Sequence, residues 1–212
     1  MVIINKANKK NLNLVSQIIK SGGLVAIPTE TVYGLAANAL DKHAVAKIFI
    51  AKGRPQDNPL IVHVAEKNEI FKLISTFPKK AEILINKFWP GPLTVILPKS
   101  NLIPDEVTAG LNSIAIRMPN HDLARQIIKL SGVPLAAPSA NRSGSPSPTR
   151  AQHVINDMDG KIDAILDGGE CSVGIESTVV SFLEEIPILL RPGGISAEEI
   201  KETIGNLKID KA

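Results

Sequence analysis

The sequence predicts an α/β protein built on a twisted mixed β-sheet that is flanked by helices. Short apolar runs of strand length alternate with amphipathic segments of helix length along nearly the whole chain. Helix-start and helix-stop residues separate these segments, and neither an internal repeat nor a domain linker is evident. With 212 residues, the chain is long enough to enclose a sizeable core.

Helices are predicted in the N-terminal half wherever apolar residues recur on one face of a helix. The predicted order is helix 11–20, strand 24–27, helix 41–53, strand 59–64, helix 79–89 and strand 93–97. Gly22-Gly23 ends the first helix, and Asp41 is the predicted N-cap of the second. Pro90-Gly91-Pro92 separates the last helix from its strand because proline cannot continue a helix.

In the C-terminal half the same patterns predict more strands than helices. The predicted order is strand 113–118, a helix opened by Pro119 and Asn120, strand 134–137, a helix from Thr149 to Met158, strands 162–166, 178–182 and 186–190, and a last helix. Thr149 with Gln152, and Ser196 with Glu199, have the spacing of capping boxes. The Ser/Pro-rich stretch 143–149, which lies between strand 134–137 and the helix from Thr149, is predicted to be an ordered loop of a binding site.

Composition narrows the possible functions. Aromatic residues make up 3% of the chain, which argues against a stacking surface for single-stranded nucleic acid. A net charge of +3 permits an anionic ligand or RNA without requiring one. Cys171 is the single cysteine, so the sequence excludes an internal disulfide and a thiolate metal cage. No signal peptide and no apolar run of membrane-spanning length are evident, which predicts a cytoplasmic protein.

The familiar nucleotide and hydrolase motifs are missing. The sequence has no P-loop, no G-x-G-x-x-G after a strand and no G-x-S-x-G nucleophile elbow. A bound nucleotide would therefore have its phosphates held by another arrangement.

Four cationic residues stand where predicted elements end. Lys52 and Arg54 follow a helix, while Arg117 and Arg191 each end a strand before a breaker. Each alone has an ordinary explanation, because cations complement helix C-termini and form salt bridges at sheet edges. Together they favour a pocket in which guanidinium groups grip carboxylate or phosphate.

Hydroxyl groups and one histidine accompany these cations. Thr29, Thr31 and Tyr33 alternate after a strand, so their side chains could share one face, although hydroxyl groups in a turn usually only hydrogen-bond the local backbone. His63 lies within an apolar strand, where a hydrogen-bonded core histidine is the default interpretation. Trp89 is interpreted as a core anchor.

Several strings occur in the order of one known family. They are Pro28 to Gly34, Lys52 to Leu60, Trp89 to Thr94, Ile116 to Pro119, Pro138 to Asn141, Glu176 to Val179 and Arg191 to Gly193. Through them the chain resembles the threonylcarbamoyl-AMP synthase family (YrdC/TsaC-like). The resemblance implies a YrdC-like fold with a concave, positively charged groove. It implies condensation of L-threonine, bicarbonate and ATP to L-threonylcarbamoyl-AMP and pyrophosphate, with Mg²⁺ accompanying ATP. The product would pass to a separate complex for N6-threonylcarbamoyladenosine modification of tRNA.

The resemblance also implies roles for individual residues. L-Threonine would lie near Thr31, His63, Arg117, Ala137 and Ser177. ATP would lie near Arg54, Asn58, Ser113, Ser139, Asn141, Ser147 and Arg191. Lys52 and Arg54 would take the catalytic positions, near bicarbonate and the reacting phosphate, and no protein side chain is assigned to a metal. Two-domain members continue into a second domain, so residues 1–212 are expected to form a single catalytic domain without it.

Two other functions remain open from the sequence. The same cations could bind tRNA or double-stranded RNA in a binding module. The domain could also transfer a carbamoyl group, as in hydrogenase-maturation enzymes, although the zinc-finger and acylphosphatase-like regions that accompany such domains are missing from the sequence.

Overall fold

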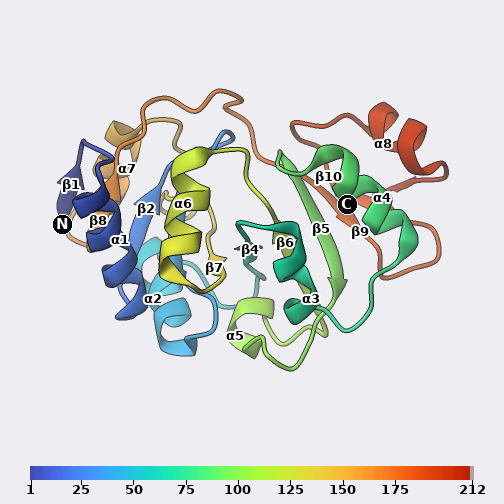
Figure 1. Cartoon of the computed structure of the whole chain (residues 1–212), viewed down its shortest axis with the longest axis horizontal. Coiled ribbons are helices and arrows are strands. Elements are labelled where there is room, and N and C mark those ends of the chain that lie inside the picture. The colour runs from blue at the N-terminus through green and yellow to red at the C-terminus, as the bar shows by residue number, and fades with distance from the viewer. Residues whose placement is uncertain (211–212) are drawn as a thin grey trace.

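Eleven strands form one mixed sheet in the computed structural model, which describes residues 1–210 (Figure 1). Across the sheet the order is β1 (Val2–Ile4), β8 (Ala164–Leu166), β2 (Val25–Ile27), β3 (Gly34–Asn38), β7 (Leu135–Ala136), β4 (Ile61–His63), β6 (Ser113–Arg117), β5 (Leu93–Pro98), β9 (Thr178–Ser181), β10 (Ile188–Arg191) and β11 (Lys208–Ile209). Parallel and antiparallel pairs both occur, so the predicted mixed α/β class is confirmed. Residues 211 and 212, the last two of the predicted single domain, lie outside the described residues.

Helices pack along the whole length of this sheet. They are α1 (Lys9–Lys20), α2 (Lys42–Lys52), α3 (Ile70–Leu73), α4 (Lys79–Phe88), α5 (Asp105–Thr108), α6 (Asp122–Ser131), α7 (Ala151–Met158) and α8 (Ala197–Ile204), with a 3₁₀ turn at Lys67–Glu69. Helix α1 packs against α6 near one end of the sheet, and α4 packs against α8 near the other (Figure 1). Within residues 1–210, no helix has both the length and the apolar character needed to cross a bilayer.

Helix ends follow local sequence chemistry, with two corrections. The Asp41 side chain caps α2, accepting from the amides of His43 and Ala44, and Gly53 ends that helix at φ 60°. The predicted capping box at Ser196 and Glu199 is present at α8.

The box predicted at Thr149 and Gln152 is wrong. Helix α7 begins at Ala151 with Arg150 as its N-cap, and His153 Nδ1 instead accepts from the Thr149 amide at 3.3 Å. Helix α6 begins at Asp122, so Pro119 and Asn120 precede the helix that they were expected to open.

Some short elements have no clear signal in the sequence. Strand β3 consists largely of small residues with weak strand propensity, and its pairing with β2 and β7 makes it a strand. Four other short elements also form only because of the segments next to them. They are the edge strands β1 and β11 and the one-turn helices α3 and α5. Tertiary pairing therefore decides these elements.

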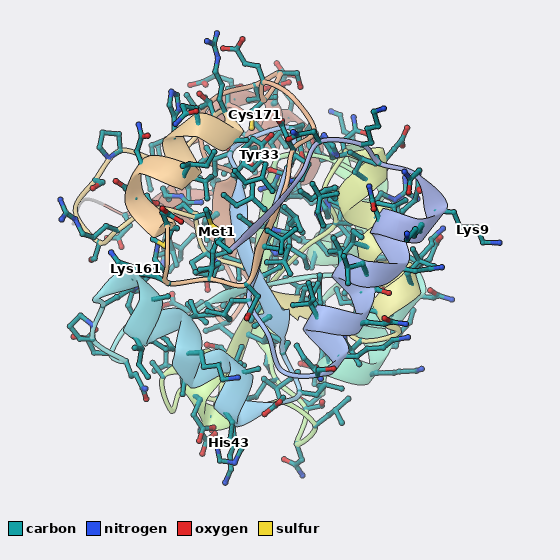
Figure 2. The ribbon with its side chains drawn as sticks, turned by 90° about the vertical axis from the view of Figure 1, so that its left-hand side faces the viewer. Met1, Lys9, Tyr33, His43, Lys161 and Cys171 are labelled. Carbon is teal, nitrogen blue, oxygen red and sulfur yellow. The ribbon has the colours of Figure 1, made fainter. Side chains whose placement is uncertain are left out.

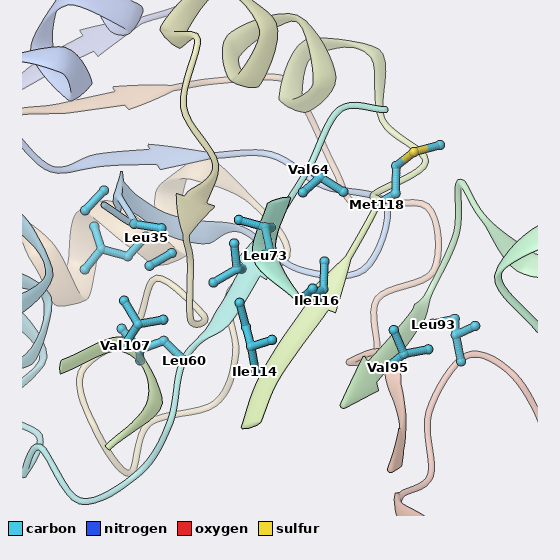
Figure 3. Close-up of a cluster of buried hydrophobic side chains, with 14 of the residues drawn as sticks. Leu35, Leu60, Val64, Leu73, Leu93, Val95, Val107, Ile114, Ile116 and Met118 are labelled. Carbon is cyan, nitrogen blue, oxygen red and sulfur yellow. The ribbon is translucent and has the colours of Figure 1, made fainter. Parts of the chain in front are cut away.

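Alternation along the strands divides the buried side chains between two cores. In β2, Val25 and Ile27 join the cluster that α1 and α6 cover, while Ala26 joins the larger cluster on the opposite side. In β6, Ile114 and Ile116 point into the larger cluster, together with Val95 of β5 (Figure 3). One face of every central strand is thus fully covered by apolar packing.

The other face of the central strands carries different residues. Its side chains come from β4, β6, β5 and β9 and are Ile61, His63, Ala115, Arg117, Ile96 and Val179. Register pairs Arg117 with His63 on one side and with Thr94 on the other, so polar groups form a row across the sheet. This face is the floor of the candidate active site.

Candidate active site

A cavity of about 540 Å³ opens above this face of the sheet. Loops that follow β2, α2 and β7, the loop that precedes β9, and Arg191 at the end of β10 form its walls. The predicted site residues on its lining are Thr31, Lys52, Arg54, Asn58, His63, Arg117, Ala137, Ser139, Asn141, Ser147, Ser177 and Arg191. Ser113, the first residue of β6, is not among the residues that line the cavity. Its assignment to ATP stays a prediction.

Arg117 is the cationic group of the floor, and it is held by the protein on several sides. Its Nη2 lies 2.7 Å from Glu30 Oε1 in an ion pair whose two side chains are about 5% exposed. Its Nη1 donates to Thr31 Oγ1 at 2.8 Å, and its Nε donates to the Gly91 carbonyl at 3.3 Å. A guanidinium carries five N–H groups, so these contacts fix its orientation and leave donors for an anion.

His63 is a neutral neighbour of this guanidinium. Burial, and secondarily the charge of Arg117, lowers the pKa of His63 to about 3. Among residues 1–210, the buried Nδ1 atom has no hydrogen-bond partner. The histidine that the sequence predicts in the core is buried, and it also lines the cavity.

Lys52 is the most buried of the cations at 2% exposure. Its ammonium donates to the Asn141 carbonyl at 2.7 Å and to the Ser139 carbonyl, and so holds the loop between them. Burial, and then the charge of Arg54, lowers the pKa of Lys52 to about 8. Arg54 itself is half-buried and donates weakly to the Asn58 carbonyl at 3.5 Å.

This lowered pKa makes anion binding sensitive to pH. We expect the affinity for pyrophosphate, measured by calorimetry, to weaken as pH rises through about 8, because the ammonium becomes neutral. Lys52→Met should bind more weakly at pH 7 and lose most of this dependence, while pyrophosphate ionises identically in both titrations. Equal slopes for the two proteins would contradict the assignment.

Lys52 also links pH to stability. Its pKa is lowered by folding, so between about pH 8 and its ordinary value of 10.5 the unfolded chain binds more protons than the folded one. This group therefore makes the free energy of unfolding rise with pH in that window.

Hydrogen bonds also hold another part of the cavity wall, which Ser147, Glu176, Ser177 and Arg191 form. Arg191 donates to the Ser177 carbonyl through Nε and Nη2, at 3.1 and 2.8 Å, and to Ser177 Oγ at 3.1 Å. Ser147 Oγ donates to Glu176 Oε1 at 2.6 Å, which lowers the pKa of Glu176. This bond joins two loops that both line the cavity.

The three residues that alternate after β2 do not share one face. Thr29 Oγ1 lies 3.0 Å from Thr31 Oγ1, and both residues line the cavity. Tyr33 is fully buried, and its hydroxyl donates to the Gly169 carbonyl at 2.7 Å. Figure 2 shows Tyr33 beside Cys171, whereas Lys9 and His43, near the starts of α1 and α2, lie at the periphery.

Two carboxylates at the site are not among the residues that the sequence predicts for it. Glu30 pairs with Arg117, and Glu176 is the acidic side chain on the cavity lining. Both lie within the strings that carry the family resemblance, and Glu30 stands between residues that are themselves buried. A charged residue in an otherwise buried run is a signal for an ion pair.

The sequence of the chain is similar to a known family and to known proteins. Residues 17–193 match the family model Sua5/YciO/YrdC, which is described as "Telomere recombination". A threonylcarbamoyl-AMP synthase of Pyrococcus abyssi is 52% identical over 100% of this chain and 63% of its own length. A threonylcarbamoyl-AMP synthase of Bacillus subtilis is 52% identical over 96% of this chain and 59% of its own.

A solved structure agrees with the fold. P. abyssi Sua5 complexed with L-threonine superposes with a TM-score of 0.98 at 52% identity, covering 100% of this chain and 63% of the other. The chain thus spans about three fifths of the length of the two curated relatives.

Proposed function

The chain belongs to the Sua5/YciO/YrdC family, and from that membership we propose that it is a threonylcarbamoyl-AMP synthase. It would join L-threonine, bicarbonate and ATP to give L-threonylcarbamoyl-AMP and pyrophosphate, acting as a nucleotidyltransferase. The product would serve N6-threonylcarbamoyladenosine modification of tRNA after transfer to a separate complex. The similarity to two curated threonylcarbamoyl-AMP synthases supports this proposal.

One observation carries the proposal: four cationic side chains from distant parts of the sequence line a single cavity. Lys52, Arg54, Arg117 and Arg191 line the cavity with one carboxylate, Glu176, and a second carboxylate, Glu30, is paired with Arg117. We propose that this excess of positive charge makes the cavity the anionic-substrate groove that the sequence predicts. Three anionic reactants would be assembled there side by side.

The chemistry needs positioning and charge neutralisation more than a nucleophilic side chain. The threonine amine attacks bicarbonate with loss of water, or attacks CO₂ with loss of a proton, and a carbamate forms. A carbamate oxygen then attacks the α-phosphorus of ATP in line, and pyrophosphate leaves. Lys52 and Arg54 would neutralise charge that grows on the phosphate oxygens, while Arg117 would hold the amino-acid carboxylate.

L-Threonine would occupy the floor of the cavity, where Thr31, His63, Ala137 and Ser177 surround Arg117. ATP would lie against the walls of the cavity. The lining residues that we propose to bind it are Arg54, Asn58, Ser139, Asn141, Ser147 and Arg191. Lys52 would lie near the reacting groups, and its contacts with the Ser139 and Asn141 carbonyls support a place beside the proposed ATP site.

Mg²⁺ would accompany the triphosphate. The cavity lining offers one carboxylate, Glu176, and residues 1–210 contain no cluster of three or more His, Cys, Asp or Glu side chains. Such a donor set suits an ion that is held mainly through phosphate oxygens and water, as Mg²⁺ commonly is. The ion would supply further neutralisation of phosphate charge.

Pyrophosphate release from ATP, with L-threonine and bicarbonate withheld in turn, tests the proposed reaction. Turnover that needs both substrates supports it, and release that is indifferent to threonine contradicts it. Tight, strongly salt-dependent binding of tRNA or double-stranded RNA without such turnover would favour the RNA-binding alternative. Carbamoyl transfer from another donor, without any need for threonine, would favour the second alternative.

The same assay gives a prediction for Arg54. We expect Arg54→Ala to lower kcat/KM for ATP by roughly tenfold or more, because a half-buried guanidinium that faces the cavity is lost. Arg150→Ala is the matched control, since Arg150 lies outside the cavity and pairs with Glu170 on the surface. A full-activity Arg54→Ala protein would remove Arg54 from the site.

A further inference from the structure

We infer that Thr94 is a positioning residue, which fixes the hydroxyl hydrogen of Ser177 toward the cavity so that it donates to the carboxylate of the amino-acid substrate. This inference rests on the proposed function, which places L-threonine on the cavity floor. Thr94 is fully buried in β5, the strand between β6 and β9. It is in register with Arg117 on β6 and with Val179 on β9.

The contact between the two hydroxyls is short and buried. Thr94 Oγ1 lies 2.7 Å from Ser177 Oγ, and the two side chains are 0% and 1% exposed. Among residues 1–210, Thr94 Oγ1 has no other hydrogen-bond partner. A buried hydroxyl that donates to nothing loses its hydration without compensation. Thr94 therefore donates its hydrogen to Ser177, since no other acceptor is within reach.

Arg191 fixes the second lone pair of Ser177. Its Nη2 donates to Ser177 Oγ at 3.1 Å, and a guanidinium can only donate. A serine hydroxyl has two acceptor sites and one hydrogen, so donation from Thr94 and Arg191 fills both acceptor sites. The hydrogen of Ser177 is then directed away from both of them, and Ser177 lines the cavity.

The Ser177 hydroxyl is therefore oriented to donate a hydrogen bond to a negatively charged group in the cavity. Without Thr94, the Ser177 hydroxyl could rotate and present a lone pair to the substrate carboxylate, which repels it. Arg117, on the cavity floor, donates to Thr31 Oγ1 at 2.8 Å, and its guanidinium lines the cavity. The carboxylate would thus meet a guanidinium and an oriented hydroxyl together.

Thr94→Val tests this role, because valine keeps the shape of threonine and removes the hydroxyl. We expect L-threonine to bind about tenfold more weakly by calorimetry. The affinity for ATP and kcat at saturating threonine should change by less than about threefold. Thr94→Ser, which keeps the donor, should restore threonine binding. Thr108→Val, also at a buried threonine but outside the cavity, is the control for the substitution itself.

A double-variant cycle decides whether Thr94 acts through Ser177. In a Ser177→Ala background, Thr94→Val should cause no further loss of threonine affinity, because its single target is gone. Additive losses would overturn the inference and indicate a general packing effect, as would unchanged binding by Thr94→Val. If the unmodified protein binds no L-threonine at all, the proposed function fails before this inference is reached, so the two failures are distinct.

Discussion

Arg117→Ala should lower kcat/KM for L-threonine by roughly hundredfold or more, about 1.4 kcal/mol for each tenfold. The guanidinium is the cation on the floor of the cavity, and its contacts with Glu30, Thr31 and Gly91 fix it there before any ligand arrives. The measurement is steady-state pyrophosphate release at varied threonine. The matched control is Arg125→Ala, since Arg125 is also partly buried and donates to the Ala65 carbonyl away from the cavity.

Loss of activity must be separated from loss of folding, because Arg117→Ala leaves the Glu30 carboxylate buried and alone. Breaking a buried ion pair in this way costs about 3–5 kcal/mol. The double variant Arg117→Met with Glu30→Gln removes both charges and should recover most of that stability in urea denaturation. It should remain inactive. Recovery of activity in the double variant would show that Arg117 acts through folding alone.

Gly193→Ala should be strongly damaging although it adds only one methyl group. A Cβ atom there would lie 2.4–2.5 Å from backbone atoms of Glu176, Ser177 and Thr178, where backbone must move to make room. We expect the free energy of unfolding to fall by about 3 kcal/mol, as for other overpacked sites. The movement would also separate Arg191 from Ser177, so kcat/KM should fall by roughly tenfold or more.

Gly160→Ala is the control for this substitution. Gly160 has φ 74° and open space around its Cβ position, so alanine there tests left-handed backbone without a collision. It should cost about 1 kcal/mol and leave activity unchanged. If Gly193→Ala unfolds at the same urea concentration as the unmodified chain, the close approach of the two backbone segments is not structurally limiting.

The sequence predicts the longer elements of this fold well, because their signals are local. Helix α2 has its aspartate cap and its terminal glycine, and Arg117 and Arg191 each end a strand as predicted. Trp89 is buried as an anchor, and its indole donates to the Leu93 carbonyl. Strand β3 escapes prediction because its small residues become a strand only between β2 and β7.

The site shows the same division between local and long-range information. Residue types at element ends predict which cations could converge, but not what holds them in place. The Lys52 contact with Asn141 spans 89 positions, and the contact between Thr94 and Ser177 spans 83. Such pairs depend on which strands become neighbours, and a single sequence carries no local pattern for that.

The floor of the cavity and the larger apolar core are opposite sides of the same thin layer of strands. Ile116 precedes Arg117 and Val62 precedes His63, so each functional group has a core residue as its immediate neighbour in the chain. Ile116→Val would therefore remove a core methyl group next to Arg117 in the chain without changing any residue that lines the cavity. The packing of the larger core thereby supports the groups on the opposite side of the strands.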